Sequence, residues 1–232
     1  MIRTITVLFS VLVLSSMIYA QNAPQAPAGY RGELMKGTSF TGFQWTPGVG
    51  DFSGKFLTEV STYNVNGEGF DNISLYGVNY GYFFSTAWAV EGVLNFGSSS
   101  QETDLGNGGT NKLSSTQFGI MVLGKYYFQP KFQDVAAWLG AGISFGSFSG
   151  TDETTGPNPD KAEVSGTSIG FGVDFGAQYF IGDGFALNAD YMLGYTSLSK
   201  PELTVTGQPT VKGPSSSFFG TMTGSLGITF YF

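Results

Sequence analysis

The sequence predicts an all-β fold: an eight-stranded antiparallel transmembrane β-barrel with short periplasmic turns and long extracellular loops. Three observations support this prediction. Long segments alternate between apolar and polar residues, the composition combines few charges with many aromatics and glycines, and the chain ends on an amphipathic aromatic segment. Alternation with a period of two is typical of strands that separate two environments.

The composition narrows the possible functions. Charged residues make up 12% of the 232 residues, about half the average of roughly 25% in globular proteins. Aromatic residues reach 16%, and 35 residues are glycine. The chain has neither Cys nor His, which excludes disulfides, Ser-His and Cys-His nucleophile pairs and most zinc sites. A net charge of −7 argues against nucleic acid binding, which needs a basic surface. We expect no cofactor and no metal.

The N-terminus has the features of a secretory signal peptide. Arg3 precedes an apolar stretch, and the segment closes on a small residue, Ala20, before Gln21. The apolar stretch is too short for a membrane-spanning helix, which needs about 20 residues. We therefore predict cleavage between Ala20 and Gln21, an N-terminal periplasmic segment over 21–35 and a barrel domain over 36–232.

Alternation is clearest near the C-terminal end of the chain. From Ile169 to Ile181, apolar residues at odd positions alternate with Gly170, Gly172, Asp174, Gly176, Gln178 and Phe180. The next segment alternates in the same way from Phe185 to Tyr195. In the last segment, parity predicts an apolar face of Phe218, Met222, Leu226, Ile228, Phe230 and Phe232. The opposite face would carry Phe219, Thr221, Thr223, Ser225, Gly227, Thr229 and Tyr231.

A soluble β-sandwich is the alternative to a membrane barrel. Its strands would usually be about 5 or 6 residues long, and its polar faces would be rich in Lys and Glu. Here the segments are longer and the polar faces carry Gly, Ser, Thr, Asn and Gln. Transmembrane strands of about 9 to 11 residues, with aromatic girdles at both interfaces, explain the pattern better.

Eight strands can be placed in order. They are 36–45, 72–84, 87–97, 114–128, 134–148, 164–181, 185–198 and 216–232. The long connections are 46–71, 98–113, 149–163 and 199–214. The first strand is the least regular, since Phe40 opposes Phe43 and Trp45 in parity. We treat Phe56–Tyr63 as a hairpin arm within the first loop.

Aromatic residues gather beside the short turns. This predicts a periplasmic girdle, because aromatic belts mark the membrane interfaces of barrels. Its members are Tyr82, Phe84, Trp88, Tyr126, Phe128, Tyr179 and Phe185. The opposite girdle would comprise Phe96, Phe145, Tyr195 and Phe218.

The last residues, SLGITFYF, contain the most specific motif. Ser225, Gly227, Phe230 and the terminal Phe232 resemble the signal that the outer-membrane barrel assembly machinery reads. The mature chain resembles the small OmpA/OmpX-like outer-membrane barrels, also called the porin family, most closely those of Bacteroidetes-type bacteria. The resemblance includes Lys36-Gly37-Thr38, the aromatic hairpin Asn79–Gly92 and the turn Tyr126–Pro130.

The resemblance implies a location and a set of partners. We expect an integral protein of the cell outer membrane of a Gram-negative bacterium, exported through its signal peptide and monomeric. Its partners would be outer-membrane lipid and lipopolysaccharide, with the barrel assembly machinery and periplasmic chaperones during biogenesis.

Alternation also predicts a polar cluster inside the barrel. Its members are Glu91, Lys125, Asp174, Asp190, Asn79, Gln178 and Asn188, together with Gln117 and Asn95. A charge inside a barrel needs a partner, and an eight-stranded barrel is just wide enough for its side chains to fill. We therefore favour a plug in which Lys125 pairs with carboxylates over a gate or a narrow polar path.

Enzymatic functions are disfavoured. Two carboxylates could in principle hydrolyse a glycoside, but a sugar could not reach them in a sealed lumen. The resemblance implies that barrel enzymes depend on histidine, which is absent here. The acidic loops have oxygen ligands without the spacing of an EF-hand. We expect a structural or surface-interaction role without catalysis; the alternative is a narrow porin-like channel for water, ions or small solutes.

Overall fold

A computed structural model describes residues 37–46, 75–106, 108–128, 134–156, 159–182 and 184–232. The predicted signal peptide, its cleavage site, the segment 21–35 and the hairpin arm Phe56–Tyr63 lie outside these residues. No helix within the described part of the chain is long and apolar enough to span a membrane.

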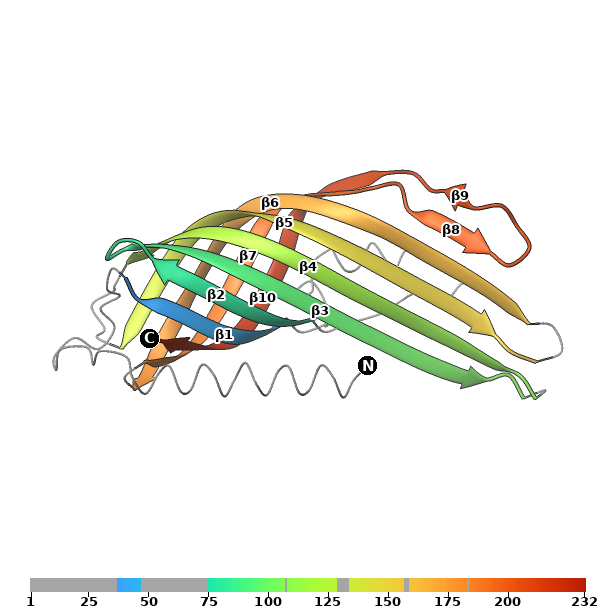
Figure 1. Ribbon diagram of the computed structural model, residues 1–232, viewed down its shortest axis with the longest axis horizontal. Coiled ribbons are helices and arrows are strands. Elements are labelled where there is room, and N and C mark those ends of the chain that lie inside the picture. The colour runs from blue at the N-terminus through green and yellow to red at the C-terminus, as the bar shows by residue number, and fades with distance from the viewer. Residues whose placement is uncertain (1–36, 47–74, 107, 129–133, 157–158, 183) are drawn as a thin grey trace.

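Ten strands build one antiparallel sheet (Figure 1). They are β1 Ser39–Thr46, β2 Leu75–Phe83, β3 Trp88–Asp104, β4 Thr110–Phe128, β5 Val135–Thr154, β6 Asp160–Gly182, β7 Phe185–Leu198, β8 Glu202–Val205, β9 Val211–Lys212 and β10 Ser216–Tyr231. Strands β1 to β7 pair in sequence, and β10 pairs with both β7 and β1. This closes an eight-stranded barrel and confirms the predicted fold class.

The period-two pattern determines which side chains point inward. In β6 the outward positions carry exposed Ile169, Phe171 and Val173, whereas the intervening inward positions carry glycines and buried polar residues. Turn chemistry then sets the register of the hairpins. Ser85 accepts backbone hydrogen bonds from Ala87 and Trp88, and Asp104 accepts one from Gly106, which has a φ of 73°. All three are hydrogen bonds between a side chain and the backbone, of the kind that stabilises tight turns.

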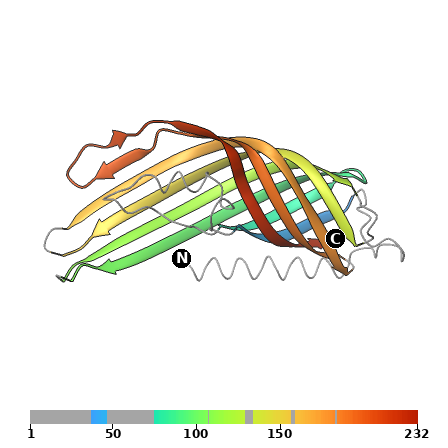
Figure 2. The ribbon, with the colours of Figure 1, turned by 180° about the vertical axis from the view of Figure 1, so that it is seen from behind.

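Strands β3 to β6 extend well beyond the ends of β1 and β2 (Figures 1 and 2). The predicted loops 98–113 and 149–163 are wrong for this reason, since most of their residues continue these strands as far as short turns. The predicted loop 199–214 likewise contains β8, which pairs with β6, and β9. Backbone pairing continues in these segments, but outward side chains outside lipid need not be apolar. The alternation of apolar and polar residues that predicts a strand is therefore missing there.

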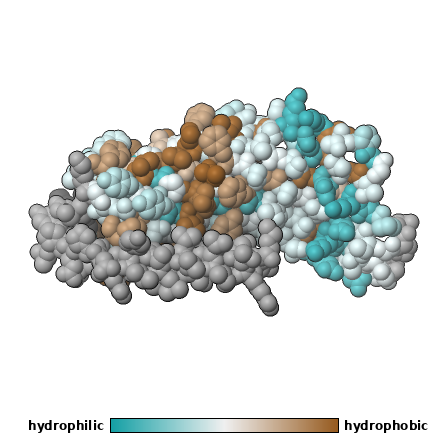
Figure 3. Space-filling model, in the orientation of Figure 1, coloured by the Kyte–Doolittle hydropathy of each residue, from teal (hydrophilic) through white to brown (hydrophobic). Residues whose placement is uncertain are grey.

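The outward side chains change character at a sharp border. Exposed apolar residues extend up to Phe96, Phe118, Phe145 and Ile169, and beyond them the outward positions carry Ser, Thr, Lys and Glu. Figure 3 shows this division between a hydrophobic and a hydrophilic half of the molecule. The segments Trp88 to Phe96 and Phe118 to Phe128 match the roughly 9 to 11 residues of a transmembrane strand. The extension therefore lies outside the hydrocarbon layer.

A β-bulge in β10 corrects the faces predicted for the last segment. The register with β7 shifts between Thr221 and Thr223. A bulge inserts one unpaired residue, so the residues before it and the residues after it follow opposite parities. Met222, predicted on the apolar outer face, is buried inside the barrel, and Phe219, predicted on the inner face, is 77% exposed. Downstream, Leu226 and Ile228 point outward, and Thr229 and Tyr231 point inward, as their parity predicts.

The irregular first strand has a simple explanation. Phe40 points into the barrel, where it is 1% exposed and packs against Phe83 and Tyr231. Trp45 is exposed on the outside. An aromatic residue thus lies on each face of β1, which is why its parity looked ambiguous.

The paired strands β6 and β7 contain a position where both backbones are closely surrounded. Gly172 and Gly194 are paired residues, and a Cβ at Gly194 would collide with the carbonyl oxygen of Phe171 and with Met222. Gly194→Ala should therefore lower the free energy of unfolding by about 1–3 kcal/mol, as overpacking does. Urea titration in lipid vesicles measures this loss. Gly220→Ala is the matched control, since a Cβ there meets no atom within 4 Å; equal effects of both variants would contradict the close approach.

The closed barrel itself predicts heat-modifiable migration. Kept cold in SDS, the refolded protein should run as a compact species, because every membrane-embedded strand is paired on both sides. Boiling should open the barrel and shift the band. A band that stays in place would contradict a closed transmembrane barrel.

Candidate functional site

The inward side chains of β4 form successive levels along the lumen. In order from the short-turn end they are Tyr127, Lys125, Leu123, Met121, Gly119, Gln117, Ser115 and Leu113. They pass from aromatic to charged to apolar to uncharged polar, and then to a second apolar cluster with Phe148 and Val164. Side chains therefore fill the lumen at most of these levels, and a small cavity lies at the level of Gly119.

Five consecutive strands supply the charged level. It comprises Asn79 of β2, Glu91 of β3, Lys125 of β4, Trp138 of β5 and Asp174 of β6, all nearly fully buried. These residues point inward for the same reason: each occupies a position of its strand between outward apolar neighbours. We call this group the lysine belt.

Lys125 lies at the centre of the lysine belt. Its Nζ is 2.6 Å from Glu91 Oε2 and 3.5 Å from Asp174 Oδ2. Nζ also lies 4.6 Å from the centroid of the Trp138 ring, within the range of a cation–π interaction. Asn79 Nδ2 donates to Glu91 Oε1 at 2.6 Å, and Trp138 Nε1 donates to Asp174 Oδ2 at 2.7 Å. Each carboxylate therefore has one cationic and one neutral partner.

Three of the other predicted lumen residues lie against β10. Half-buried Asp190 accepts a hydrogen bond from Ser225 Oγ at 2.7 Å. Gln178 accepts one from the Tyr231 hydroxyl. Asn188 lies over Gly227, where any Cβ would meet its amide. Gln117 and Asn95 are buried at a different level, and Asn95 accepts a hydrogen bond from Gln44 at 3.2 Å.

An aromatic cluster lies next to the lysine belt, toward the short turns, and the sequence analysis did not identify it as a unit. Its aromatic members are Phe40, Phe83, Tyr127, Trp138, Phe180 and Tyr231. Successive rings are 4.9–5.6 Å apart, for example Phe83–Tyr127 and Tyr127–Trp138. The sequence does contain an indication of this cluster. Phe83 and Tyr127 each lie one residue away from a girdle aromatic and therefore on the opposite, inward face of the strand.

The predicted C-terminal signal lies at the seam of the barrel. Phe232 and Ser39 exchange backbone hydrogen bonds of 2.8 and 2.9 Å, and a Cβ on Gly227 would lie 2.6 Å from the carbonyl oxygen of Phe43 in β1. Phe230 packs against Phe185. Ser225 instead contacts Asp190, as described above. These residues thus connect the last strand to both of its neighbours.

The predicted periplasmic girdle lies on the outer surface at the short-turn end. Phe185 is half-buried against Phe230. The other members are exposed; they are Tyr82, Phe84, Trp88, Tyr126, Phe128 and Tyr179.

The arrangement offers little chemistry. The belt carboxylates Glu91 and Asp174 are already paired, and the chain has no Cys or His to serve as nucleophile or base. In the described part of the chain, no group of three or more His, Cys, Asp or Glu side chains is placed to hold a metal ion. The site is best described as a set of paired charges that connects neighbouring strands.

The lysine belt should contribute strongly to stability. Lys125→Met would leave Glu91 and Asp174 without a counter-charge, which typically costs about 3–5 kcal/mol for a buried pair. Urea unfolding in vesicles, followed by tryptophan fluorescence, measures the loss. The triple variant Lys125→Met, Glu91→Gln, Asp174→Asn removes the charges together and should recover most of it. A triple variant as unstable as the single one would show that lost packing, rather than unpaired charge, is responsible.

Comparison with known proteins identifies the family. The model of the "outer membrane protein beta-barrel domain" family matches residues 9–219. No match to a curated protein was found.

Among solved structures, Ail, the attachment invasion locus protein of Yersinia pestis, in complex with the heparin analogue sucrose octasulfate, is 14% identical. The match covers 85% of this chain and 100% of Ail, with a TM-score of 0.48. OprG from Pseudomonas aeruginosa is also 14% identical, with 87% and 98% coverage and a TM-score of 0.48. Neisserial surface protein A is 16% identical, with 85% and 98% coverage and a TM-score of 0.40.

The family model covers most of the chain, and the described strands form the closed barrel that its description names. The chain therefore belongs to the outer membrane protein beta-barrel domain family and is a transmembrane β-barrel of the cell outer membrane.

Proposed function

We propose that this protein has a structural or surface-interaction role in the outer membrane and that its lumen is plugged by its own side chains. The observation that carries the proposal is the lysine belt lying directly beside the aromatic cluster. Lys125 contacts Glu91 and Asp174 across three strands, and Tyr127, the next inward residue of β4, packs between Phe83 and Trp138.

The two levels obstruct passage for different reasons. The aromatic cluster is apolar, so an ion crossing it would lose its hydration without compensation. The lysine belt is polar, but its ammonium and belt carboxylates already satisfy one another. Moving Lys125 aside would separate buried charges, which is costly. Both features support a closed lumen over an open path.

The extracellular extension supports a surface role. β6 has 23 residues and is about 75 Å long, far more than a tilted membrane-spanning strand needs. Its outward side chains beyond the apolar border are Ser, Thr, Lys and Glu. Lys161 and Glu163 form a 2.5 Å ion pair there, with both side chains about half exposed, and this hydrogen bond raises the pKa of Lys161 above its usual range. Exposed pairs contribute little to stability, so this surface is free to serve solvation or contact.

Export and assembly belong to the same proposal. Residues 1–20 would direct secretion, with cleavage between Ala20 and Gln21. Ser225, Gly227, Phe230 and Phe232 would present β10 to the barrel assembly machinery, after escort by periplasmic chaperones. The folded protein would be a monomer among lipid and lipopolysaccharide, with the girdle aromatics at the periplasmic interface.

A catalytic role is not part of the proposal. The lumen carboxylates contact Lys125, Trp138, Asn79 and Ser225, and the barrel around them leaves no room for a sugar or lipid headgroup beside them. Activity of the purified protein on lipid A, phospholipid or peptide would contradict this.

Planar-bilayer recording tests the plugged lumen. The refolded protein should produce no stable steps of ion current, because the lysine belt and the aromatic cluster close the lumen in series. Regular steps from the unaltered protein would instead establish a narrow channel for water, ions or small solutes and overturn the proposal. The double variant Phe83→Ala, Tyr127→Ala should also stay silent, because the lysine belt still closes the lumen after the aromatic cluster has been opened; its folding is checked by heat-modifiable migration.

A further inference from the structure

Three methionines from distant parts of the chain meet inside the barrel. The whole sequence contains 6 methionines, and Met121 of β4, Met192 of β7 and Met222 of β10 share one buried cluster. Val93 and Leu123 complete it. All three methionine side chains are almost fully buried and line the same cavity. We call them the methionine triad.

Met222 reaches this place through an irregularity in the strand. It is the extra residue of the β10 bulge, and the bulge turns its side chain into the lumen. Bulges commonly re-aim a side chain at functional sites. Glycines of β6, the strand beyond β7, leave space for it, because a Cβ on Gly170 would lie 2.5 Å from Met222 Cε and one on Gly172 would lie 2.8 Å from Met222 Sδ. A Cβ on Gly172 would also lie 3.0 Å from Met192 Cε, so the side chains of Met192 and Met222 both lie over Gly172.

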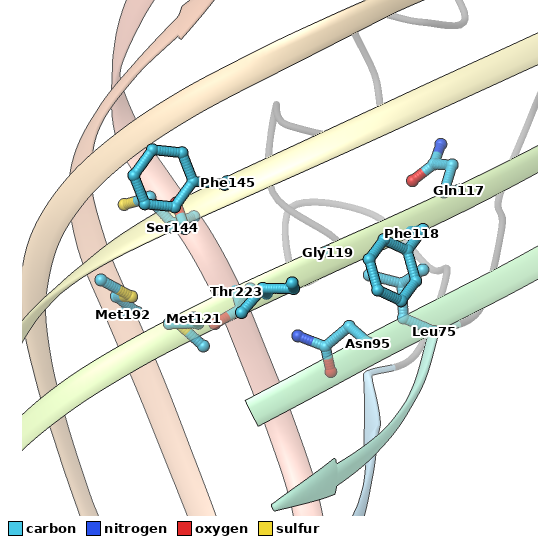
Figure 4. Close-up of a pocket in the computed structure, with 12 residues that line it drawn as sticks. Leu75, Asn95, Gln117, Phe118, Gly119, Met121, Ser144, Phe145, Met192 and Thr223 are labelled. Carbon is cyan, nitrogen blue, oxygen red and sulfur yellow. The ribbon is translucent and has the colours of Figure 1, made fainter. Parts of the chain in front are cut away.

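The cavity beside the triad is small and has a polar side. It offers about 30 Å³ to the centres of water-sized molecules, roughly twice what one buried water needs. Asn95, Gln117 and Ser144 line it together with the methionines, and Figure 4 shows Gln117 and Asn95 at some distance from Met192. The amide of Gln117 is buried without a hydrogen-bond partner among the described residues. Such a cavity has room for an ion and about one water, but not for a sugar or a lipid.

The charge next to the triad favours a cation. Asp174 is the cross-strand partner of Met192, and Asp190 is the preceding inward residue of β7. Together with Glu91 these are three carboxylates against the single ammonium of Lys125. The surroundings therefore carry a formal excess of negative charge. Because thioether ligands are uncharged, this excess would balance the charge of a bound cation.

We propose that the methionine triad binds a soft monovalent cation, Cu(I), for which Ag(I) is the experimental substitute. Thioether sulfur is a soft ligand that selects Cu(I) over hard cations such as Ca²⁺ and Mg²⁺, which require oxygen. The side-chain oxygen atoms of Asn95, Gln117 and Ser144 would replace water around the ion as it enters. The site lies next to the lysine belt, on the side away from the short turns. The proposal does not depend on whether the lumen conducts.

A methionine triad can also serve packing alone, since methionine fills irregular gaps. The two roles are separated by Met→Leu substitution, which keeps the volume and the apolar character at a typical cost below about 1.5 kcal/mol but removes the sulfur. Leu123→Ile is the matched control within the same cluster, because it changes side-chain shape and retains all three sulfurs.

The test is a titration of the refolded barrel with Ag(I) in detergent micelles, followed by calorimetry and by NMR of ¹³C-methyl methionine. We expect one ion per barrel and shifts of the methyl resonances of Met121, Met192 and Met222. Met192→Leu and Met222→Leu should each weaken binding by at least about tenfold, and the double variant should abolish it. Leu123→Ile should bind as the unaltered protein does. Heat-modifiable migration shows that each variant is folded.

Two outcomes would overturn the proposal. One is an absence of methyl shifts on adding Ag(I) to the unaltered barrel. The other is binding that persists in the folded double variant, which would place the ion elsewhere. Neither bears on the plugged lumen, which the bilayer recording decides separately.

Discussion

The structure depends on one constraint: in lipid, no strand can leave its backbone hydrogen-bonding groups unpaired. The pairing of β10 with β1, ending in the reciprocal bonds between Phe232 and Ser39, satisfies this constraint by closing the sheet. Closure with eight strands makes the lumen narrow. The inward side chains must then fill that space among themselves, which is why glycines lie opposite large residues, such as Gly176 against Trp138 and Gly81 against Phe40.

A narrow lumen also explains the form of the lysine belt. Lys125 contacts buried side chains from β3, β5 and β6, so its charge must be balanced within a few ångströms. Glu91, Asp174 and the Trp138 ring provide that balance, and Asn79 completes the hydrogen bonding of Glu91. The arrangement braces five neighbouring strands with one cation. Its cost is a high penalty for losing any single charge.

The same strands serve a second environment beyond the membrane. Along β3 to β6 the backbone pairing is uninterrupted, and only the outward side chains change, from aromatic and aliphatic to Ser, Thr, Lys and Glu. The barrel wall thereby becomes an extracellular sheet that carries β8 and β9 at its edge. This sheet is thus a direct continuation of the paired strands of the membrane domain.

The sequence alone determined the period of two, the number of barrel strands, the inward parity of the belt residues and the outward parity of the girdle. These are local properties, because the residue types along each strand alternate with the two environments that its faces meet. Three features were decided only by the tertiary structure. The strand extensions lack an apolar signal once they leave lipid, the bulge at Met222 inverts parity without any mark in composition, and Phe40 joins rings from five other strands. Each depends on which strands become neighbours, and closure of the sheet decides that.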